Sequence, residues 1–174
     1  LAGNIAFASG SHTIASGASV AGASLTLFDP VPNADSSVNL TIANGVSGTM
    51  NQLSVAAGIL TGNGNVSTGN LVWNGGMLTG GGTLTTNGGT IGSGIYSKKL
   101  NKQLINASGV LNWSGGSKIE LQSNGSIVNQ AGATFNVSNG GELWDGTILN
   151  SGTIHKTGPG STALNRNVNA GNDS

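Results

Sequence analysis

The sequence predicts an all-β fold, a parallel β-helix (solenoid) with about 21 residues per coil and roughly eight coils. Three observations lead to this prediction. The composition disfavours helices, the apolar residues alternate in short runs that end at glycine, and both asparagines and leucines return at a nearly constant spacing.

Composition disfavours helices along the whole chain. Gly, Asn, Ser and Thr make up about half of the residues, far more than in an ordinary globular domain. Gly costs roughly 1 kcal/mol in a helix interior relative to Ala, and every window of about a dozen residues contains Gly, Asn or Ser. The best helical candidate, residues 96–107 (YSKKLNKQLINA), is weak because its apolar residues are poorly spaced.

Short alternating runs predict strands of about three to five residues with one buried face. The Asn-Gly dipeptides between them could close antiparallel hairpins and give a β-sandwich instead. Repetition of the pattern at about 20 to 25 residues favours the solenoid, in which each repeat buries its apolar face by stacking on its neighbours. The clearest strand candidates are residues 24–28, 38–42, 82–86, 118–122 and 133–137.

Three series of residues define the period. One consists of asparagines that each begin a phrase with glycine a few positions later. The second consists of leucines about 21 or 22 residues apart, and the third of apolar residues about 20 to 24 apart. The series are Asn44, Asn65, Asn87, Asn106, Asn129 and Asn150; Leu78, Leu100, Leu121, Leu143 and Leu164; and Leu71, Ile91, Leu111, Phe135 and Ile154.

Each coil is expected to hold three short strands and three turns. Coils stack about 4.8 Å apart, so eight coils make a rod roughly 40 Å tall, and like residues form ladders inside it. The leucine series and the Leu/Ile/Phe series are expected to be the inner columns of two faces. The inner column of the third face is expected to be Ile105, Val128 and Leu149.

A repeated tryptophan phrase fits the same period. GNLVWNGG begins at Gly69 and returns as GVLNWSGG at Gly109, about two coils later. We therefore expect Trp73 and Trp113 on one face of the rod with one coil between them. The Gly-Gly that follows each of them is expected to supply a positive φ or a close approach of two backbones. Trp144 lies outside this register.

The chain is expected to form one domain. Residues 1–164 make the solenoid, with a loop excursion at residues 28–37, whose prolines cannot donate to a ladder, and residues 165–174 make a polar tail or linker. Cysteine is absent, which excludes a disulfide framework and thiolate metal sites. Membrane insertion is not expected, because no run of about 18 to 20 apolar residues occurs.

Residues 78–91 (LTGGGTLTTNGGTI) and 148–160 (ILNSGTIHKTGPG) resemble the repeats of bacterial secreted β-helices. These are the filamentous-haemagglutinin-like and autotransporter-passenger-like modules of large extracellular surface proteins. The resemblance covers roughly residues 60–164. It implies right-handed winding, an exported protein located outside the cell or on the bacterial cell surface, and a role as a stalk or adhesin. It supplies no active site.

Charged residues argue against several function classes. Six basic and six acidic side chains cancel, so no field attracts nucleic acid or an anionic membrane. Polysaccharide-cleaving β-helices need clustered acids and bases. Glu120 and Glu142 are expected to stack one coil apart, with Lys99 below, Ala163 above and Asp145 nearby, and we interpret this column as a solvated surface.

The remaining candidates also have structural interpretations. His12 and His155 are expected at opposite ends of the rod, too far apart to form a pair. The glycine-rich residues 62–65 and 80–84 are interpreted as coil turns, because no helix or lysine of a phosphate-binding loop follows them. Lys98, Lys99 and Lys102 form the only basic cluster, interpreted as a solvated loop, with a grip on an acidic polysaccharide as the alternative.

Two polar patterns concern the ladders themselves. Asn106, Asn129 and Asn150 are expected to form an asparagine ladder whose amides link successive coils. The threonines in residues 83–86 raise an ice-binding interpretation. It is disfavoured because neighbouring coils place Asn, Ser or Lys at equivalent positions.

Together with the resemblance to bacterial secreted β-helices, the sequence predicts a structural or adhesive β-solenoid module of an exported bacterial surface or filament-forming protein. We expect it to stack head to tail, by self-association or against adjoining repeats, because the strand edges of terminal coils recruit other chains unless they are capped. No enzymatic activity, cofactor or metal is expected. The alternative is a carbohydrate-binding or polysaccharide-cleaving β-helix, with a surface polysaccharide as its partner.

Overall fold

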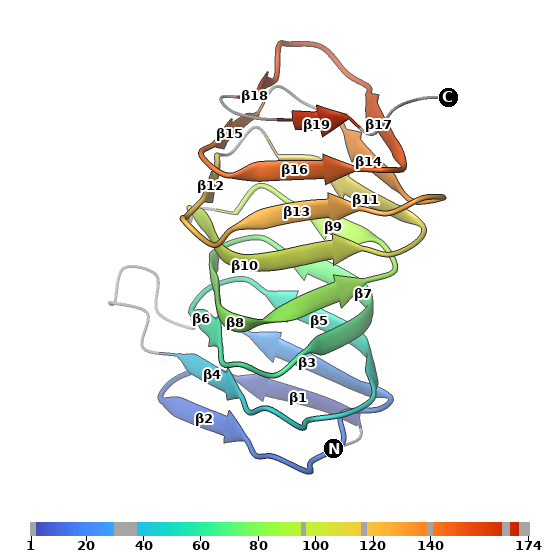
Figure 1. Ribbon diagram of the computed structural model, residues 1–174. Helices are drawn as coiled ribbons and strands as arrows, with labels where there is room; N and C mark the ends of the chain where they lie inside the picture. The colour runs from blue at the N-terminus through green and yellow to red at the C-terminus, as the bar shows by residue number, and fades with distance from the viewer. Residues whose placement is uncertain are drawn as a thin grey trace.

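The computed structural model describes residues 3–29, 38–94, 97–115, 118–138, 141–164 and 168–170. The regular structure of these residues consists of 19 strands that pair in parallel, without a helix. None of the described residues therefore forms a helix long and apolar enough to cross a membrane. The chain forms a β-solenoid of about seven turns with about 21 residues per coil (Figure 1). The predicted fold class and coil length are confirmed, and the number of turns is close to the eight coils expected.

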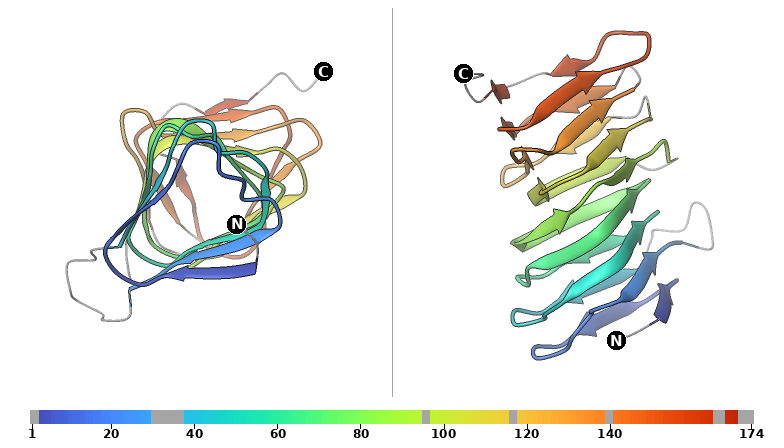
Figure 2. Two further views of the ribbon diagram at one scale, coloured as in Figure 1. Left: turned by 90° about the horizontal axis from the view of Figure 1, so that it is seen from below. Right: turned by 90° about the vertical axis from the view of Figure 1, so that its right-hand side faces the viewer.

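The winding of the solenoid is right-handed. In Figure 1 the near strands, such as β13 and β16, run from left to right, and the chain returns behind them while it climbs from the N-terminal to the C-terminal end. Viewed along the rod axis, the coils overlay one another around a common interior (Figure 2). Three faces enclose this interior, and we name each by the residues of its inner ladder.

The leucine face carries Leu78, Leu100 and Leu121, which lie in register on successive coils as predicted. The series breaks at the next coil, because Leu143 pairs with Ile119 and not with Leu121. From there Leu143 pairs with Leu164. The strands of this face are β2 (Ser11–Ile14), β4 (Asn39–Ile42), β6 (Ile59–Thr61), the first part of β8 (Gly76–Thr86), the first part of β10 (Lys98–Asn106), β12 (Ile119–Leu121), β15 (Glu142–Trp144) and β18 (Ala163–Leu164).

The tryptophan face carries Trp73 and Trp113. Both pair with Ile91, so one coil lies between the two tryptophans, as the repeated phrase predicted. The glycines that follow act as expected: Gly76 has a φ of +81°, and a Cβ on Gly115 would lie 2.5 Å from the backbone nitrogen of Ser93. The strands are β1 (Gly3–Phe7), β3 (Ala23–Leu27), the second part of β5 (Thr49–Val55), the second part of β7 (Val66–Trp73), β9 (Gly89–Ile91), β11 (Val110–Trp113), β14 (Thr134–Val137) and β17 (Thr153–Lys156).

The prediction for the Leu/Ile/Phe column is wrong at one position. Ile91 belongs to the tryptophan column, and Gly89 takes the place between Leu71 and Leu111. A side chain does not fit there, since a Cβ on Gly89 would lie 2.0 Å from the carbonyl oxygen of Leu71. The backbone of β9 therefore packs closely on β7, and the ladder resumes above it through Leu111, which pairs with Phe135.

The asparagine face carries the pairs Ile105–Val128 and Val128–Leu149 in the predicted register. The prediction that these side chains point inward is wrong by one residue. They point outward, since Ile105 and Val128 are half-buried and Leu149 is 40% exposed. The inner column is Leu84, Leu104, Ile127 and Ile148. The strands are the first parts of β5 and β7, the second parts of β8 and β10, β13 (Ser126–Asn129), β16 (Thr147–Asn150) and β19 (Val168–Ala170).

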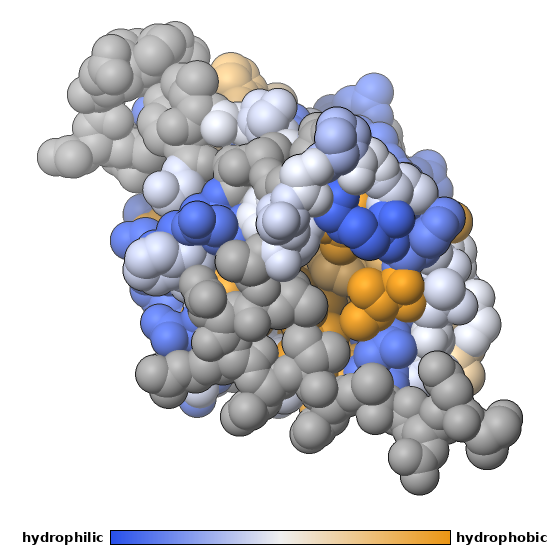
Figure 3. Space-filling model, turned by 90° about the horizontal axis from the view of Figure 1, so that it is seen from above, coloured by the Kyte–Doolittle hydropathy of each residue, from blue (hydrophilic) through white to orange (hydrophobic). Residues whose placement is uncertain are grey.

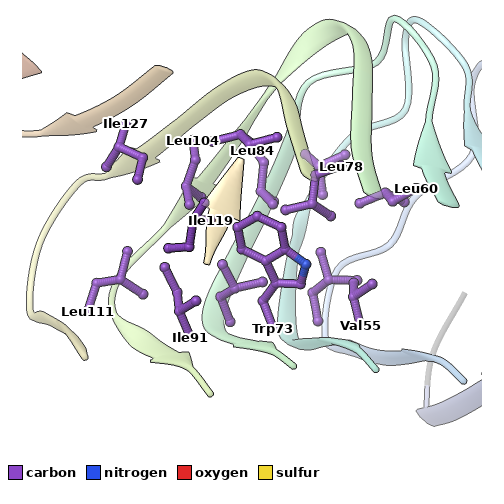
Figure 4. Close-up of a cluster of buried hydrophobic side chains, with 14 of the residues drawn as sticks. Val55, Leu60, Trp73, Leu78, Leu84, Ile91, Leu104, Leu111, Ile119 and Ile127 are labelled. Carbon is purple, nitrogen blue, oxygen red and sulfur yellow. The ribbon is translucent and has the colours of Figure 1, made fainter. Parts of the chain in front are cut away.

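The core is a continuous column of side chains from all three faces. Figure 4 shows Trp73 surrounded by Leu78 of the leucine face and Leu84 of the asparagine face. The indole of Trp73 is fully buried, and its Nε1 donates to the carbonyl oxygen of Gly75 at 3.0 Å, so its polar group is satisfied. Trp113 stacks on Phe135 with ring centroids 6.3 Å apart.

The strand candidates agree with the observed strands to within one or two residues at their ends, except that residues 82–86 form only the last part of β8. Residues 96–107, the weak helical candidate, contain strand β10. In the expected loop excursion, residues 30–37 lie outside the described part of the chain. Strand β19 pairs with β16, so the ladder continues past residue 164, where the tail was expected to begin, and residues 165–167 and 171–174 lie outside the described part.

Candidate functional site

The outer side of the leucine face carries a group of four side chains that we call the Trp144 cluster: Lys118, Glu120, Glu142 and Trp144. Two strands position it. In β12 the flanking residues Ile119 and Leu121 point inward, and in β15 Leu143 does, so the alternating residues point outward.

The register of the cluster differs from the expectation. Glu120 pairs with Trp144, so the predicted stacking of Glu120 on Glu142 is wrong. Paired residues of β12 and β15 are 24 positions apart (119 to 143), longer than the 21 or 22 of the leucine series, and the extra residues shift Glu142 off the Glu120 column. The other neighbours are as expected: Lys99 pairs with Glu120, and Ala163 pairs with Glu142.

Three contacts hold the cluster together. The indole Nε1 of Trp144 donates to Oε2 of Glu142 at 2.7 Å. The Nζ of Lys118 lies 3.5 Å from the centroid of the Trp144 ring, a cation–π geometry. The same Nζ lies 3.8 Å from Oε2 of Glu120. The indole therefore has a fixed polar partner on its edge and a cation against its face.

Solvent screens these charges. The side chains of Lys118 and Glu120 are 36% and 34% exposed, so their ion pair contributes about 1 kcal/mol or less to stability. Trp144 is 41% exposed, in contrast to the two buried tryptophans of the core. The cluster thus presents an aromatic surface to solvent, with carboxylates beside it.

In the described part of the chain, no three His, Cys, Asp or Glu side chains lie close enough together to hold a metal ion. Asp145 follows the cluster with a φ of +51° and begins the short turn into β16. The histidines are at opposite ends of the rod, His12 on β2 and His155 on β17, as predicted (Figure 1).

The basic cluster is not a solvated loop. Lys98 and Lys102 point into the interior from β10 and are fully buried or nearly so, while Lys99 points outward. Burial lowers the pKa of Lys98, and it lowers the pKa of Lys102 to about 8. The Nζ of Lys102 has no hydrogen-bond partner. These lysines do not form an exposed patch that could grip an acidic polysaccharide.

The asparagine ladder is confirmed. Nδ2 of Asn106 donates to Oδ1 of Asn129, and Nδ2 of Asn129 donates to Oδ1 of Asn150. The ladder does not extend to Asn87. The residue below Asn106, on the preceding coil, is Thr86, and its hydroxyl donates to the carbonyl oxygen of Gly88. The ladder is a structural feature of the interior.

Residues 62–65 form a coil turn, as interpreted, but residues 80–84 lie within strand β8, at the corner where it passes from the leucine face to the asparagine face. Gly80 and Gly82 pack on Gly62 and Gly64 of the coil below, where a Cβ on Gly82 would lie 2.1 Å from the carbonyl oxygen of Gly64. Above them a shallow groove of about 500 Å³ is lined by Gly80, Gly81, Gly82, Thr83, Asn101, Lys102, Gln103 and Asn124. Its exposed polar groups are mainly amides, and nothing in it resembles a phosphate cradle.

The threonines do not form a flat ladder. Thr83 pairs with Gln103, and Thr85 has Ser67 below it and Ile105 above it. An ordered array of threonines repeated over several coils is therefore missing around residues 83–86.

An apolar cavity of about 300 Å³ lies at the C-terminal end of the rod. Figure 3, which views the rod from this end, shows apolar atoms among polar ones there. In the middle of the rod the inner residues, such as Leu104 and Leu111, are fully buried. The cavity is lined by Phe135, Val137, Ile148, Ile154, Lys156, Gly160, Ser161 and Thr162.

The Trp144 cluster does not follow from a constant coil length, which would place Glu142 above Glu120. A usable signal was present: KIELQ places Lys118 and Glu120 on one side of a strand, and ELW does the same for Glu142 and Trp144. Comparison of the chain with family models, with curated proteins and with solved structures found no match. The function is therefore inferred from the geometry of the chain itself.

Proposed function

We propose that this chain is a structural or adhesive β-solenoid module of an exported bacterial surface or filament-forming protein, located outside the cell or on its surface. It stacks end to end, against adjoining coils of a longer chain or against a second copy of itself. The observation that carries this proposal is the apolar cavity at the C-terminal end of the rod.

Both ends of the rod bury their inner residues less completely than the middle does. Ile5 and Phe7 on the first coil are only partly buried, whereas their partners Leu25 and Leu27 on the next coil are fully buried. At the other end Ile154 is only partly buried, whereas its partner Phe135 is fully buried. Each end therefore offers apolar side chains that a further coil would cover.

Electrostatics does not oppose this association. The net charge is zero, so two molecules have little long-range repulsion to keep them apart. Contact between the first coil of one copy and the last coil of another is heterologous and does not close, so it leads to filaments.

Catalysis is not part of the proposal. The predicted stacking of Glu120 on Glu142, on which the polysaccharide-cleaving alternative depended, does not form, because Glu120 pairs with Trp144. Turnover of an acidic polysaccharide that is abolished by Glu120→Ala or Glu142→Ala would favour the enzyme over the structural module.

Sedimentation of the purified chain over a range of concentrations tests the proposal. We expect association that increases with concentration and elongated particles in electron micrographs. Ile154→Lys should reduce the association, because it places a charge at the apolar end. His155→Lys is the matched control, since its outward position on the same strand leaves the end unchanged. A chain that stays monomeric at high concentration, or equal effects of the two variants, would contradict the proposal.

A further inference from the structure

Trp144 is the exposed tryptophan of this chain. Trp73 and Trp113 fill the core, while Trp144 is 41% exposed on the outer side of the leucine face. Leu143, between the outward-pointing Glu142 and Trp144, supplies the buried contact of strand β15. Packing of the coil therefore does not require an aromatic residue at position 144.

The indole is held in place before any ligand arrives. Its Nε1 donates to Glu142 at 2.7 Å, and Lys118 covers one ring face at 3.5 Å from the centroid. Glu120 fixes Lys118 in turn, at 3.8 Å. A side chain that is already ordered loses less conformational entropy on binding, so this arrangement favours a ligand that stacks on the remaining face.

The charged groups around the Trp144 indole can form hydrogen bonds with the hydroxyls of a ligand. The carboxylates of Glu120 and Glu142 are acceptors, and the ammonium of Lys118 is a donor. Lys99, which pairs with Glu120, adds a second positive charge, and Asp145, directly after Trp144, adds a third negative one, so the charges nearly cancel. This balance gives no strong field for an anionic or a cationic ligand.

We propose that the Trp144 cluster binds a neutral saccharide. The apolar C–H face of an equatorially substituted, β-linked sugar ring stacks on the indole, its hydroxyls donate to the carboxylates, and a ring or hydroxyl oxygen accepts from Lys118. This binding site goes beyond end-to-end stacking and does not depend on it.

Isothermal titration calorimetry with two neutral ligands, the hexamers of β-1,4-linked glucose and of β-1,4-linked N-acetylglucosamine, tests the proposal. We expect at least one of them to bind. Trp144→Ala should weaken that binding at least about tenfold, and Trp144→Phe should retain part of it, because a smaller ring still stacks. The control is Leu149→Ala, which removes an exposed apolar residue from the asparagine face and should bind as the unchanged chain does.

Circular dichroism separates lost binding from lost structure. We expect all three variants to keep the β-sheet spectrum, because each change is on the surface. The proposal is overturned if neither hexamer binds at about 10 mM, if Trp144→Ala binds as tightly as the unchanged chain, or if an acidic oligogalacturonate binds more tightly than both neutral hexamers.

Discussion

Asn106 donates a hydrogen bond from Nδ2 to Oδ1 of Asn129 at 2.9 Å, although 23 residues separate them in the chain. Asn129 repeats the contact with Asn150 on the next coil at 2.8 Å. Asn106 and Asn129 are fully buried. Three coils are thus joined by side-chain amides, and a slip of one residue in any of them would break the ladder.

Replacing Asn129 with Ala should cost about 2 to 4 kcal/mol of unfolding free energy, because it leaves buried groups on the coils above and below without their partner. The matched control is Asn136→Ala. Asn136 makes a similar contact with Asn112 at 2.8 Å, but on the outer side of the rod, where water replaces a lost partner. Its expected cost is about 1 kcal/mol. Urea unfolding measures the loss of unfolding free energy in both variants, and equal losses would contradict a buried ladder.

The lower end of the ladder offers a stabilising change. Oδ1 of Asn106 has no hydrogen-bond partner, and Thr86 lies below it in register. Thr86→Asn should extend the ladder by one amide, whose Nδ2 would donate to Asn106. We expect a gain of about 1 kcal/mol. A Tm that is unchanged or lower would show that the ladder cannot be extended in this direction.

Substitutions at two adjacent residues of strand β10 test which of its side chains point into the rod. Leu104 is fully buried and Ile105 points outward. Leu104→Asp should cost more than about 3 kcal/mol, because it buries an unpaired carboxylate. Ile105→Asp should cost about 1 kcal/mol, because it removes only part of an apolar contact. The reverse order in denaturant unfolding would show that the asparagine face is turned by one residue.

The alternation of apolar residues alone did not settle that direction. The segments QLIN, SIVN and TILN each contain two adjacent apolar residues, so alternation fits either one as the inner member. The asparagine that follows decides it. Once Asn106 is inside, the period of two places Leu104 inside and Ile105 outside.

The coil period was predictable from the leucines as far as Leu121, because successive coils there have nearly equal lengths. Beyond it a coil of 24 residues, from Ile119 to Leu143, breaks the register. A change of two residues keeps inward residues inward, so the hydrophobic pattern does not reveal it. The Trp144 cluster depends on this shift and was therefore not predictable from a constant period.

Replacing Lys102 with Met should stabilise the fold. The side chain is only 1% exposed, and Nζ has no hydrogen-bond partner. Burial lowers the pKa of Lys102 to about 8. Relative to the usual value of about 10.5, this shift corresponds to about 3 kcal/mol against the charged form. Lys99→Met is the control, since Lys99 is exposed on the same strand and should change stability little.

The gain from Lys102→Met should depend on pH with a definite sign. A lowered pKa means that the folded state binds fewer protons than the unfolded state between about pH 8 and pH 10.5, so the stability of the unchanged chain rises across this window. The gain is therefore full below about pH 8 and fades as the pH approaches 10.5. Urea unfolding of both proteins across this range measures it, and a constant difference would contradict a buried amine.

Distances between spin labels test the stacked register directly. Ala6, Thr26, Ser54, Val72, Thr90, Asn112, Asn136 and His155 form one column on the outer side of the tryptophan face. Because the chain has no cysteine, pairs of single cysteines on this column can be labelled without background.

Double electron–electron resonance on Thr26→Cys/Asn112→Cys and on Ala6→Cys/His155→Cys is the most direct measurement. The labelled residues are four and seven strand spacings apart in the column. At about 4.8 Å per spacing, the distances between the backbone sites should be about 19 Å and about 34 Å. Narrow distance distributions near these values are the predicted result. Distances that do not increase with the number of coils, or broad distributions for both pairs, would contradict the solenoid.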